Sequence, residues 1–248
     1  MKRLLLATVA FAALSAPAMA ADLATKYPVK AVAVVPVFSW TGFYIGANVG
    51  YGGDKFTFDE VESYYGYPYY ANSTSLNSSG FFAGGQIGYN YQFANNVVLG
   101  VETDLQWSGI EGKEDYSSVY VYGGYPYTSS YGASVDYFGT IRARIGYAFD
   151  RFLPYITGGA AYGKTKISSS YAGDGFGSLS ASATNWGWTV GGGVEYAITN
   201  NWTFKTEYLY VDLGSTDYTY GSYDGFYTYA GTVDTKFHTL KAGVNYKF

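Results

Sequence analysis

The sequence predicts an all-β protein, an eight-stranded antiparallel transmembrane β-barrel, and three observations support this prediction. Segments in which apolar and polar residues alternate recur along the chain, which is the pattern of strands with one apolar face. Aromatic residues make up 21% of the chain, with 30 tyrosines beside 33 glycines. The connections between the segments are alternately short and long, as in outer-membrane barrels. A secreted β-sandwich is the alternative, although its crossings give no reason for that alternation.

Residues 1–20 have the pattern of a secretory signal peptide. Lys2 and Arg3 form the positive start, residues 4–14 the apolar run and residues 18–20 a small-residue cleavage site. The run is too short to cross a bilayer as a helix. We therefore expect export and removal of this segment, which makes the mature chain more acidic than the formal net charge of −4.

Residues 21–40 separate the signal from the predicted barrel at 41–248. The segment contains Pro28 and Pro36 and no clear period, and proline limits strand pairing. We predict a short periplasmic extension, with insertion into the barrel as the alternative.

Eight alternating segments follow, each long enough to cross a bilayer as a tilted strand. In the fourth, Val135 and Tyr137 are expected on the outer face; in the fifth, Ile156 lies opposite Leu153 and Tyr155, so its faces are ambiguous. The predicted strands are 41–51, 81–93, 97–107, 133–149, 152–164, 183–196, 202–213 and 235–248.

The last predicted strand alternates most strictly and ends on an aromatic residue. Leu240, Ala242 and Val244 share a face with Tyr246 and Phe248. We interpret Tyr246 and Phe248 as a C-terminal signal for the barrel-assembly machinery, with outer-membrane lipid as the other partner of the strands.

The predicted connections assign the two ends of the barrel. Residues 94–96, 150–151 and 198–201 form short turns, whereas 52–80, 108–132, 165–182 and 214–234 form four long loops. Short turns face the periplasm in such barrels, and an even strand number then leaves both termini periplasmic. The protein is expected in the bacterial outer membrane.

The long loops are rich in tyrosine. Tyrosine with glycine and serine makes adaptable contact surfaces, so the loops could bind an extracellular ligand, or they could be strands that continue above the membrane without a partner. The first two loops are acidic, which argues against nucleic-acid binding. The tyrosine-rich stretches are 63–70, 116–131 and 218–229.

Tryptophans are predicted at both edges of the apolar band. Trp202 begins its strand beside a short turn, while Trp107, Trp186 and Trp188 lie near the loop ends of theirs. Aromatic residues at these levels form the girdles of membrane barrels.

The inward-facing positions carry a balanced set of charges. An eight-stranded barrel is just wide enough for side chains to fill its interior, so we predict a lumen that is plugged by ion pairs, with Arg142 and Arg144 paired to Asp104, Glu102 and neighbouring carboxylates. A narrow gated conduit and acid–base catalysis are the alternatives. The set comprises Glu102, Asp104, Arg142, Arg144, Glu195, Lys205, Glu207 and Lys241.

No catalytic, metal or cofactor site is predicted. The chain has no cysteine and a single histidine, His238, which shares the outward face of Leu240. A triad would need a matching serine and acid, and none stands out, so we expect an interfacial histidine rather than a catalytic or haem-binding one. The protein is therefore predicted not to be an enzyme.

Several stretches of the chain carry a resemblance to a known family. They are Trp40-Thr41-Gly42-Phe43-Tyr44-Ile45-Gly46-Ala47-Asn48-Val49-Gly50-Tyr51-Gly52 at the start of the predicted barrel, then Gly191-Gly192-Gly193-Val194-Glu195-Tyr196, Asn201-Trp202 and Glu207-Tyr208-Leu209-Tyr210-Val211-Asp212-Leu213-Gly214, and the terminal Phe248. These stretches are similar to small outer-membrane barrels of alphaproteobacteria, which are major surface antigens of the OmpA-type architecture. The resemblance implies an envelope-stabilising surface protein, and alternatively a porin-like channel for small solutes or loops that bind haem or a host surface.

Overall fold

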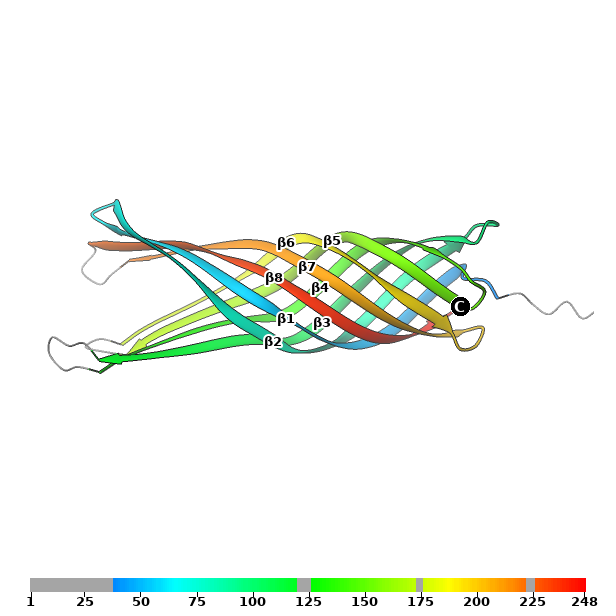
Figure 1. Ribbon diagram of the computed structural model, residues 1–248, viewed down its shortest axis with the longest axis horizontal. Coiled ribbons are helices and arrows are strands. Elements are labelled where there is room, and N and C mark those ends of the chain that lie inside the picture. The colour runs from blue at the N-terminus through cyan, green and yellow to red at the C-terminus, as the bar shows by residue number, and fades with distance from the viewer. Residues whose placement is uncertain (1–37, 120–125, 173–175, 222–225) are drawn as a thin grey trace, which may run out of the picture. The chain divides into compact units, whose positions relative to one another are not determined.

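The computed structural model describes residues 38–119, 126–172, 176–221 and 226–248. The predicted signal peptide and most of the predicted extension lie outside these ranges. Eight antiparallel strands pair in chain order and β8 pairs with β1, so the sheet closes into a barrel (Figure 1). The strands are β1 (Gly42–Tyr64), β2 (Tyr67–Gln92), β3 (Val97–Val119), β4 (Pro126–Tyr147), β5 (Phe152–Ala172), β6 (Phe176–Ala197), β7 (Trp202–Gly221) and β8 (Tyr227–Lys247). Within the described ranges, no helix is long and apolar enough to cross a membrane.

The strands run further than the alternation predicted. The first segment expected as a long loop is instead the continuation of β1 and β2, which stay paired from Gly42 opposite Asn90 to Tyr64 opposite Tyr67. The turn between them consists of Tyr65 and Gly66, with φ angles of 50° and 80°. Positive φ at both central residues defines a type I′ turn, whose twist suits a hairpin.

The barrel is closed over only part of the strand length. Pairing of β2 with β3 ends at Ser79 opposite Glu111, and pairing of β6 with β7 ends at Trp188 opposite Asp212. Beyond these points the strands form two separate four-stranded sheets, which diverge at the left of Figure 1. We call β7–β8–β1–β2 the first hairpin sheet and β3–β4–β5–β6 the second hairpin sheet.

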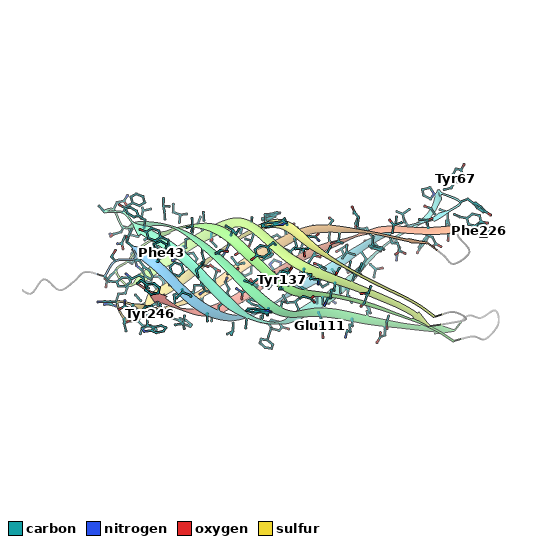
Figure 2. The ribbon with its side chains drawn as sticks, turned by 180° about the vertical axis from the view of Figure 1, so that it is seen from behind. Phe43, Tyr67, Glu111, Tyr137, Phe226 and Tyr246 are labelled. Atoms are coloured by element: carbon teal, nitrogen blue, oxygen red, sulfur yellow. The ribbon has the colours of Figure 1, made fainter. Side chains whose placement is uncertain are left out.

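The two faces of the barrel wall carry opposite chemistry, as the alternation predicted. Apolar side chains point outward: Phe43 is 67% exposed and Trp107 70% exposed. Charged and amide side chains at the intervening positions, such as Glu102 and Gln86, are buried in the interior. Figure 2 shows Phe43 and Tyr246 near the short-turn end, and Tyr67 and Phe226 at the long-hairpin end.

The prediction that Val135 faces outward is wrong. Val135 is buried, because an irregularity between Val135 and Tyr137 inserts one extra residue into β4 opposite β5. A bulge of this kind reverses which side chains point inward. On β3 the same reversal follows the irregularity between Trp107 and Ile110, and it turns Ile110 into the interior.

The ambiguous strand β5 presents Leu153 and Tyr155 to the interior and Ile156, 67% exposed, to the outside. Its apolar inward positions at the short-turn end contribute to a buried apolar cluster described below.

Candidate functional site

The charged residues predicted for the lumen lie together in the middle of the closed barrel, and all eight are buried. Arg142 contacts three carboxylates, Glu102 at 2.6 Å, Asp104 at 3.0 Å and Glu207 at 2.9 Å. Arg144 pairs with Glu195 at 2.9 Å. The guanidinium fork of Arg142 suits several acceptors at once.

The two lysines connect opposite walls of the barrel. Lys205 on β7 reaches Glu102 on β3 at 2.7 Å. Lys241 on β8 reaches Asp104 on β3 at 2.8 Å. It also contacts Glu207 on the adjacent strand β7 at 2.9 Å. Four carboxylates and four cations thus compensate one another in this network.

Hydroxyl and amide groups satisfy further acceptors and donors of the network. Tyr44 donates to Glu102 at 2.7 Å, and Tyr155 donates to Glu207 at 2.9 Å. The guanidinium of Arg144 lies between the two tyrosines, 5.1 Å from the ring of Tyr44 and 5.0 Å from that of Tyr155. Hydrogen bonds to the charged form are what make a buried ion tolerable. The further polar contributors are Asn90, Thr140, Thr203 and Asn245.

Two glycines make room for these tyrosines. A Cβ at Gly88 would lie 2.3 Å from the hydroxyl oxygen of Tyr44, and one at Gly193 would lie 2.8 Å from that of Tyr155. Both separations are shorter than a carbon–oxygen contact allows, so the tyrosine side chains cross the lumen over bare backbone.

An apolar layer lies above the ionic network, towards the long-hairpin end. At its centre Phe138 packs edge-on against Phe82 at 5.2 Å and against Phe237 at 5.1 Å between ring centroids. We call the cluster the apolar cap; it comprises Phe56, Leu76, Phe82, Ile110, Ala133, Val135, Phe138, Ala161, Ile167, Leu209, Val211, Leu213, Val233 and Phe237, all buried.

A second apolar cluster closes the short-turn end. Trp40 is 1% exposed, and its indole N–H donates to the carbonyl of Asp150 at 3.0 Å. Its backbone N–H donates to Gln92 at 2.8 Å. We call this cluster the apolar floor; it comprises Phe38, Trp40, Val98, Ala148, Leu153, Tyr155 and Ala197.

Sequence reasoning missed both apolar layers. Residues 38–40, predicted as part of the extension, pack into the barrel, which is the alternative that the sequence leaves open for this segment. Apolar residues on both faces of a segment were the available signal. In β7, for example, Leu209, Val211 and Leu213 occupy the positions that continue the row of Lys205 and Glu207.

The tryptophans predicted for the girdles lie on the outer surface at two levels. Trp202 packs against Tyr246 at 5.1 Å at the short-turn end. Trp186 and Trp188 pack against Tyr162 and Tyr210 near the point where the barrel opens. Trp107 is exposed just before the irregularity in β3.

The C-terminal residues complete the closure of the sheet. Tyr246 lies opposite Ile45 in the β1–β8 ladder, and the backbone N–H of Phe248 donates to the carbonyl of Phe43 at 3.0 Å.

His238 points outward as predicted, but it has partners that the sequence did not reveal. Tyr208 lies 2.5 Å from its Nδ1 and Asp54 lies 3.4 Å from its Nε2.

An apolar outer belt around a filled interior with an ionic centre defines this molecule as an outer-membrane β-barrel, since among sheets only a closed one can satisfy its backbone in lipid. The family model described as "Outer membrane protein beta-barrel domain" matches residues 6–248. The chain belongs to that family.

Known proteins support the assignment. The chain is 41% identical to the 31 kDa outer-membrane immunogenic protein of Brucella melitensis over the whole of both chains. It is 37% identical to the 22 kDa outer membrane protein of Rhizobium leguminosarum, covering 79% of this chain and 72% of that protein. The crystal structure of OprG from Pseudomonas aeruginosa shares the fold, with a TM-score of 0.51 and 15% identity over 85% of this chain and 98% of OprG.

Proposed function

We propose that the protein is a structural, surface-presenting component of the outer membrane whose barrel does not conduct. The observation that carries this proposal is the apolar cap. An ionic network alone could hydrate and pass ions, but Phe82, Phe138 and Phe237 join across the interior in a layer without charged groups. Moving an ion into such a layer is costly.

Two further barriers lie in series with the apolar cap. The charges of the ionic network are paired and hydrogen-bonded, so they offer no free site for an ion, and the apolar floor closes the other end around Trp40. A narrow porin-like channel, the alternative, would require all three layers to open together.

Planar-bilayer recording with the mature protein tests this proposal. We expect no reproducible open state. A stable open state of large conductance in the unaltered protein would refute the structural function and favour the channel.

We propose that the short-turn end faces the periplasm and the two hairpin sheets face outward. This orientation agrees with the layout of bacterial barrels, and the word "immunogenic" in the Brucella relative's name supports surface exposure. Because the chain contains no cysteine, one introduced cysteine reports the location of its own end.

The orientation is tested on intact cells with a maleimide that does not cross membranes. We expect labelling of Tyr67→Cys, which lies at the β1–β2 hairpin tip, and no labelling of Asn95→Cys in a short turn. The reverse pattern would contradict the orientation. Detergent-solubilised protein serves as the control, in which both cysteines should react.

Ligand binding by the hairpin tips is a second candidate function. Tyr64, Tyr65 and Tyr67 are exposed, and Tyr65 packs against Phe226 at 4.9 Å. Exposed aromatic residues on a stable hairpin provide contact area at low entropic cost. Deleting residues 62–70 and closing the hairpin with a two-residue turn should abolish any such binding and leave the barrel folded.

We infer no enzymatic function, since the buried carboxylates among the described residues are engaged in ion pairs. The partners that we propose are outer-membrane lipid and, through the strand that contains Tyr246 and Phe248, the barrel-assembly machinery. Nucleic acid is not among them.

A further inference from the structure

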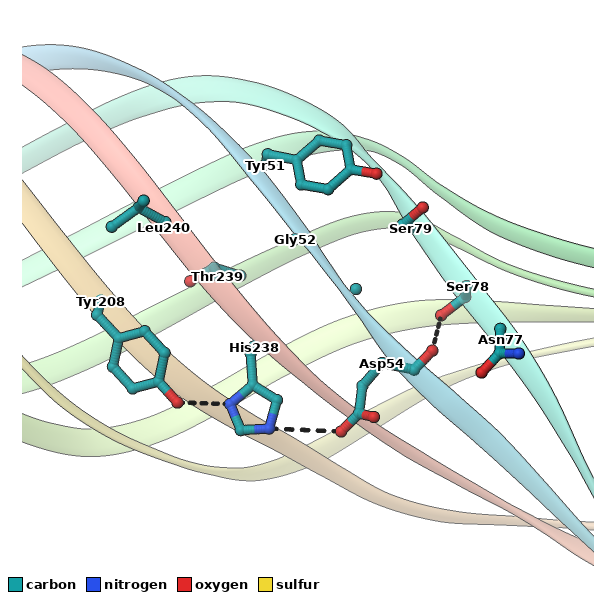
Figure 3. Close-up of a pocket in the computed structure, with 11 residues that line it drawn as sticks. Tyr51, Gly52, Asp54, Asn77, Ser78, Ser79, Tyr208, His238, Thr239 and Leu240 are labelled. Atoms are coloured by element: carbon teal, nitrogen blue, oxygen red, sulfur yellow. Dashed lines mark hydrogen bonds and ion pairs between the residues drawn. The ribbon is translucent and has the colours of Figure 1, made fainter.

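A groove on the outer surface of the barrel lies where β8, β1 and β2 leave the closed barrel for the first hairpin sheet (Figure 3). Its volume is about 510 Å³. Tyr51, Tyr208 and Leu240 line it on the side of the apolar belt, and Asp54, Asn77, Ser79 and His238 line it on the side of the long hairpins.

Two features of the backbone create this hollow. Gly53 cannot carry a side chain, because a Cβ there would lie 2.3 Å from the carbonyl oxygen of Ser78. The β1–β8 ladder pairs Gly53 with His238 and then resumes only at Phe56 opposite Thr235. The strands therefore separate locally beside His238, and the bottom of the groove is bare backbone and small side chains.

The histidine in the groove is held by contacts on both ring nitrogens. Nδ1 lies 2.5 Å from the hydroxyl of Tyr208, and Nε2 lies 3.4 Å from a carboxylate oxygen of Asp54. Figure 3 shows this chain of three side chains running across β7, β8 and β1. Three strands thus present one oriented set of polar groups, which is what a binding site needs.

Several polar groups in the groove remain available. In the described part of the chain, no hydrogen bond engages the hydroxyl of Tyr51, the amide of Asn77 or the hydroxyl of Ser79. The second carboxylate oxygen of Asp54 also has no partner there. Hydroxyl and amide groups can both donate and accept, whereas a carboxylate accepts, so together they match a ligand with several hydroxyl groups.

The position of the groove selects a membrane-borne ligand. The ring of His238 lies 5.1 Å from the ring of Tyr210, centroid to centroid. The ring of Tyr210 in turn lies 5.3 Å from that of Trp188 in the aromatic girdle. Such girdles lie at the level of lipid headgroups. A headgroup in the groove would face the polar residues while its acyl chains passed Tyr51 and Leu240, both exposed on the apolar belt.

The carboxylate of Asp54 disfavours a phosphate as the recognised group. Asp54 would repel it at short range, whereas sugar hydroxyls can donate to Asp54 and rest against the ring of Tyr51. We propose that this groove binds the sugar headgroup of an outer-leaflet saccharolipid, with Asp54 and His238 as the central contacts. This assignment rests on the proposed placement of the barrel in the membrane.

The single histidine provides a direct probe. Protein with an isotope-labelled imidazole is placed in phosphatidylethanolamine nanodiscs. NMR spectra are recorded while a phosphate-free saccharolipid with a glucosamine headgroup is added in steps. We expect the ring signals of His238 to shift and to saturate. A nanodisc presents both membrane surfaces, so the result does not depend on which end of the barrel faces outward. This test therefore stays valid even if cysteine labelling contradicts the proposed orientation.

Three variants sharpen the test. Ser79→Trp fills the groove and should abolish the shift. Asp54→Asn keeps the shape and should weaken binding about tenfold, which corresponds to about 1.4 kcal/mol. Asp217→Asn removes an exposed carboxylate of the first hairpin sheet outside the groove and should bind like the unaltered protein. Heat-modifiable gel migration checks that each variant is folded.

Each other outcome counts against the proposal. The absence of a shift, an equal shift with phosphatidylglycerol, or an undiminished shift in Ser79→Trp would overturn it. Equal affinity for the free headgroup sugar in solution would assign the groove to a soluble sugar. It would overturn the proposal that the ligand is a lipid.

Discussion

Lys205 and Glu195 lie directly opposite each other in the β6–β7 ladder, yet each is paired with a different residue. Lys205 reaches Glu102 at 2.7 Å, and Glu195 binds Arg144 at 2.9 Å. Neighbouring strands could have satisfied both charges locally. The observed pairs instead tie β7 to β3 across the lumen and β6 to β4 past the intervening β5, so the network joins strands that are not neighbours in the sheet.

Arg142→Ala should destabilise the barrel. Arg142 serves three buried carboxylates, and removing one partner of a buried pair typically costs about 3–5 kcal/mol because the other charge is left uncompensated. Urea-induced unfolding in lipid vesicles measures the loss. Lys55→Ala, which removes an exposed cation of β1, should change stability little; equal losses in both variants would contradict the role of the network.

The apolar cap and the ionic network should act in series against ion flow. Phe138→Ala removes the ring that contacts both Phe82 and Phe237 and should cost about 3–5 kcal/mol of stability. In a Trp40→Ala background, which weakens the apolar floor, planar-bilayer recording should detect little conductance when either variant is added alone and more when Phe138→Ala and Arg142→Ala are combined. If Phe138→Ala alone conducts in that background as well as the combination, the ionic network is no barrier.

Trp40→Ala should weaken the short-turn end although Trp40 precedes the first strand. The buried indole packs edge-on against Phe38 at 5.0 Å and ties residues 38–40 to the turn at Asp150. Truncating a buried tryptophan typically costs about 3–5 kcal/mol. The matched control is Ser39→Ala, at the exposed position between Phe38 and Trp40 in the sequence. Thermal unfolding, followed by gel migration, compares the two variants. An unaltered midpoint in Trp40→Ala would show that residues 38–40 only rest on the barrel.

The outer-face residue Tyr137 provides a contrast to these interior variants. Its hydroxyl lies 3.5 Å from that of Thr184 on the outside of the wall. Tyr137→Ala should reduce anchoring in lipid without raising conductance in planar bilayers. A conductance increase as large as that of an interior variant would show that the outer face also controls the lumen.

Gly66→Ala should disturb only the tip of the first hairpin sheet. Gly66 has φ of 80°, and a side chain in this left-handed region costs about 1–2 kcal/mol. We expect faster proteolysis between residues 62 and 70 and an unchanged barrel core. Ser73→Ala, within β2 of the same hairpin, should leave the cleavage rate unaltered.

The sequence by itself determined the fold class, the strand count and the face of most residues, because a period of two is a local property that each strand carries in its own side chains. It also indicated that the inward charges balance. Residues such as Glu102 and Arg142 lie opposite each other in adjacent strands, and that pairing follows from register.

Only the tertiary structure decided which groups meet across the interior. The Lys205–Glu102 pair joins residues 103 positions apart, and it depends on barrel closure and stagger rather than on any local pattern. The reversal of Val135 required a bulge, and the apolar cap required knowledge of which inward positions lie at one height. The contacts of His238 with Tyr208 and Asp54 likewise exist because barrel closure brings β1, remote in sequence, beside β8, the partner of β7.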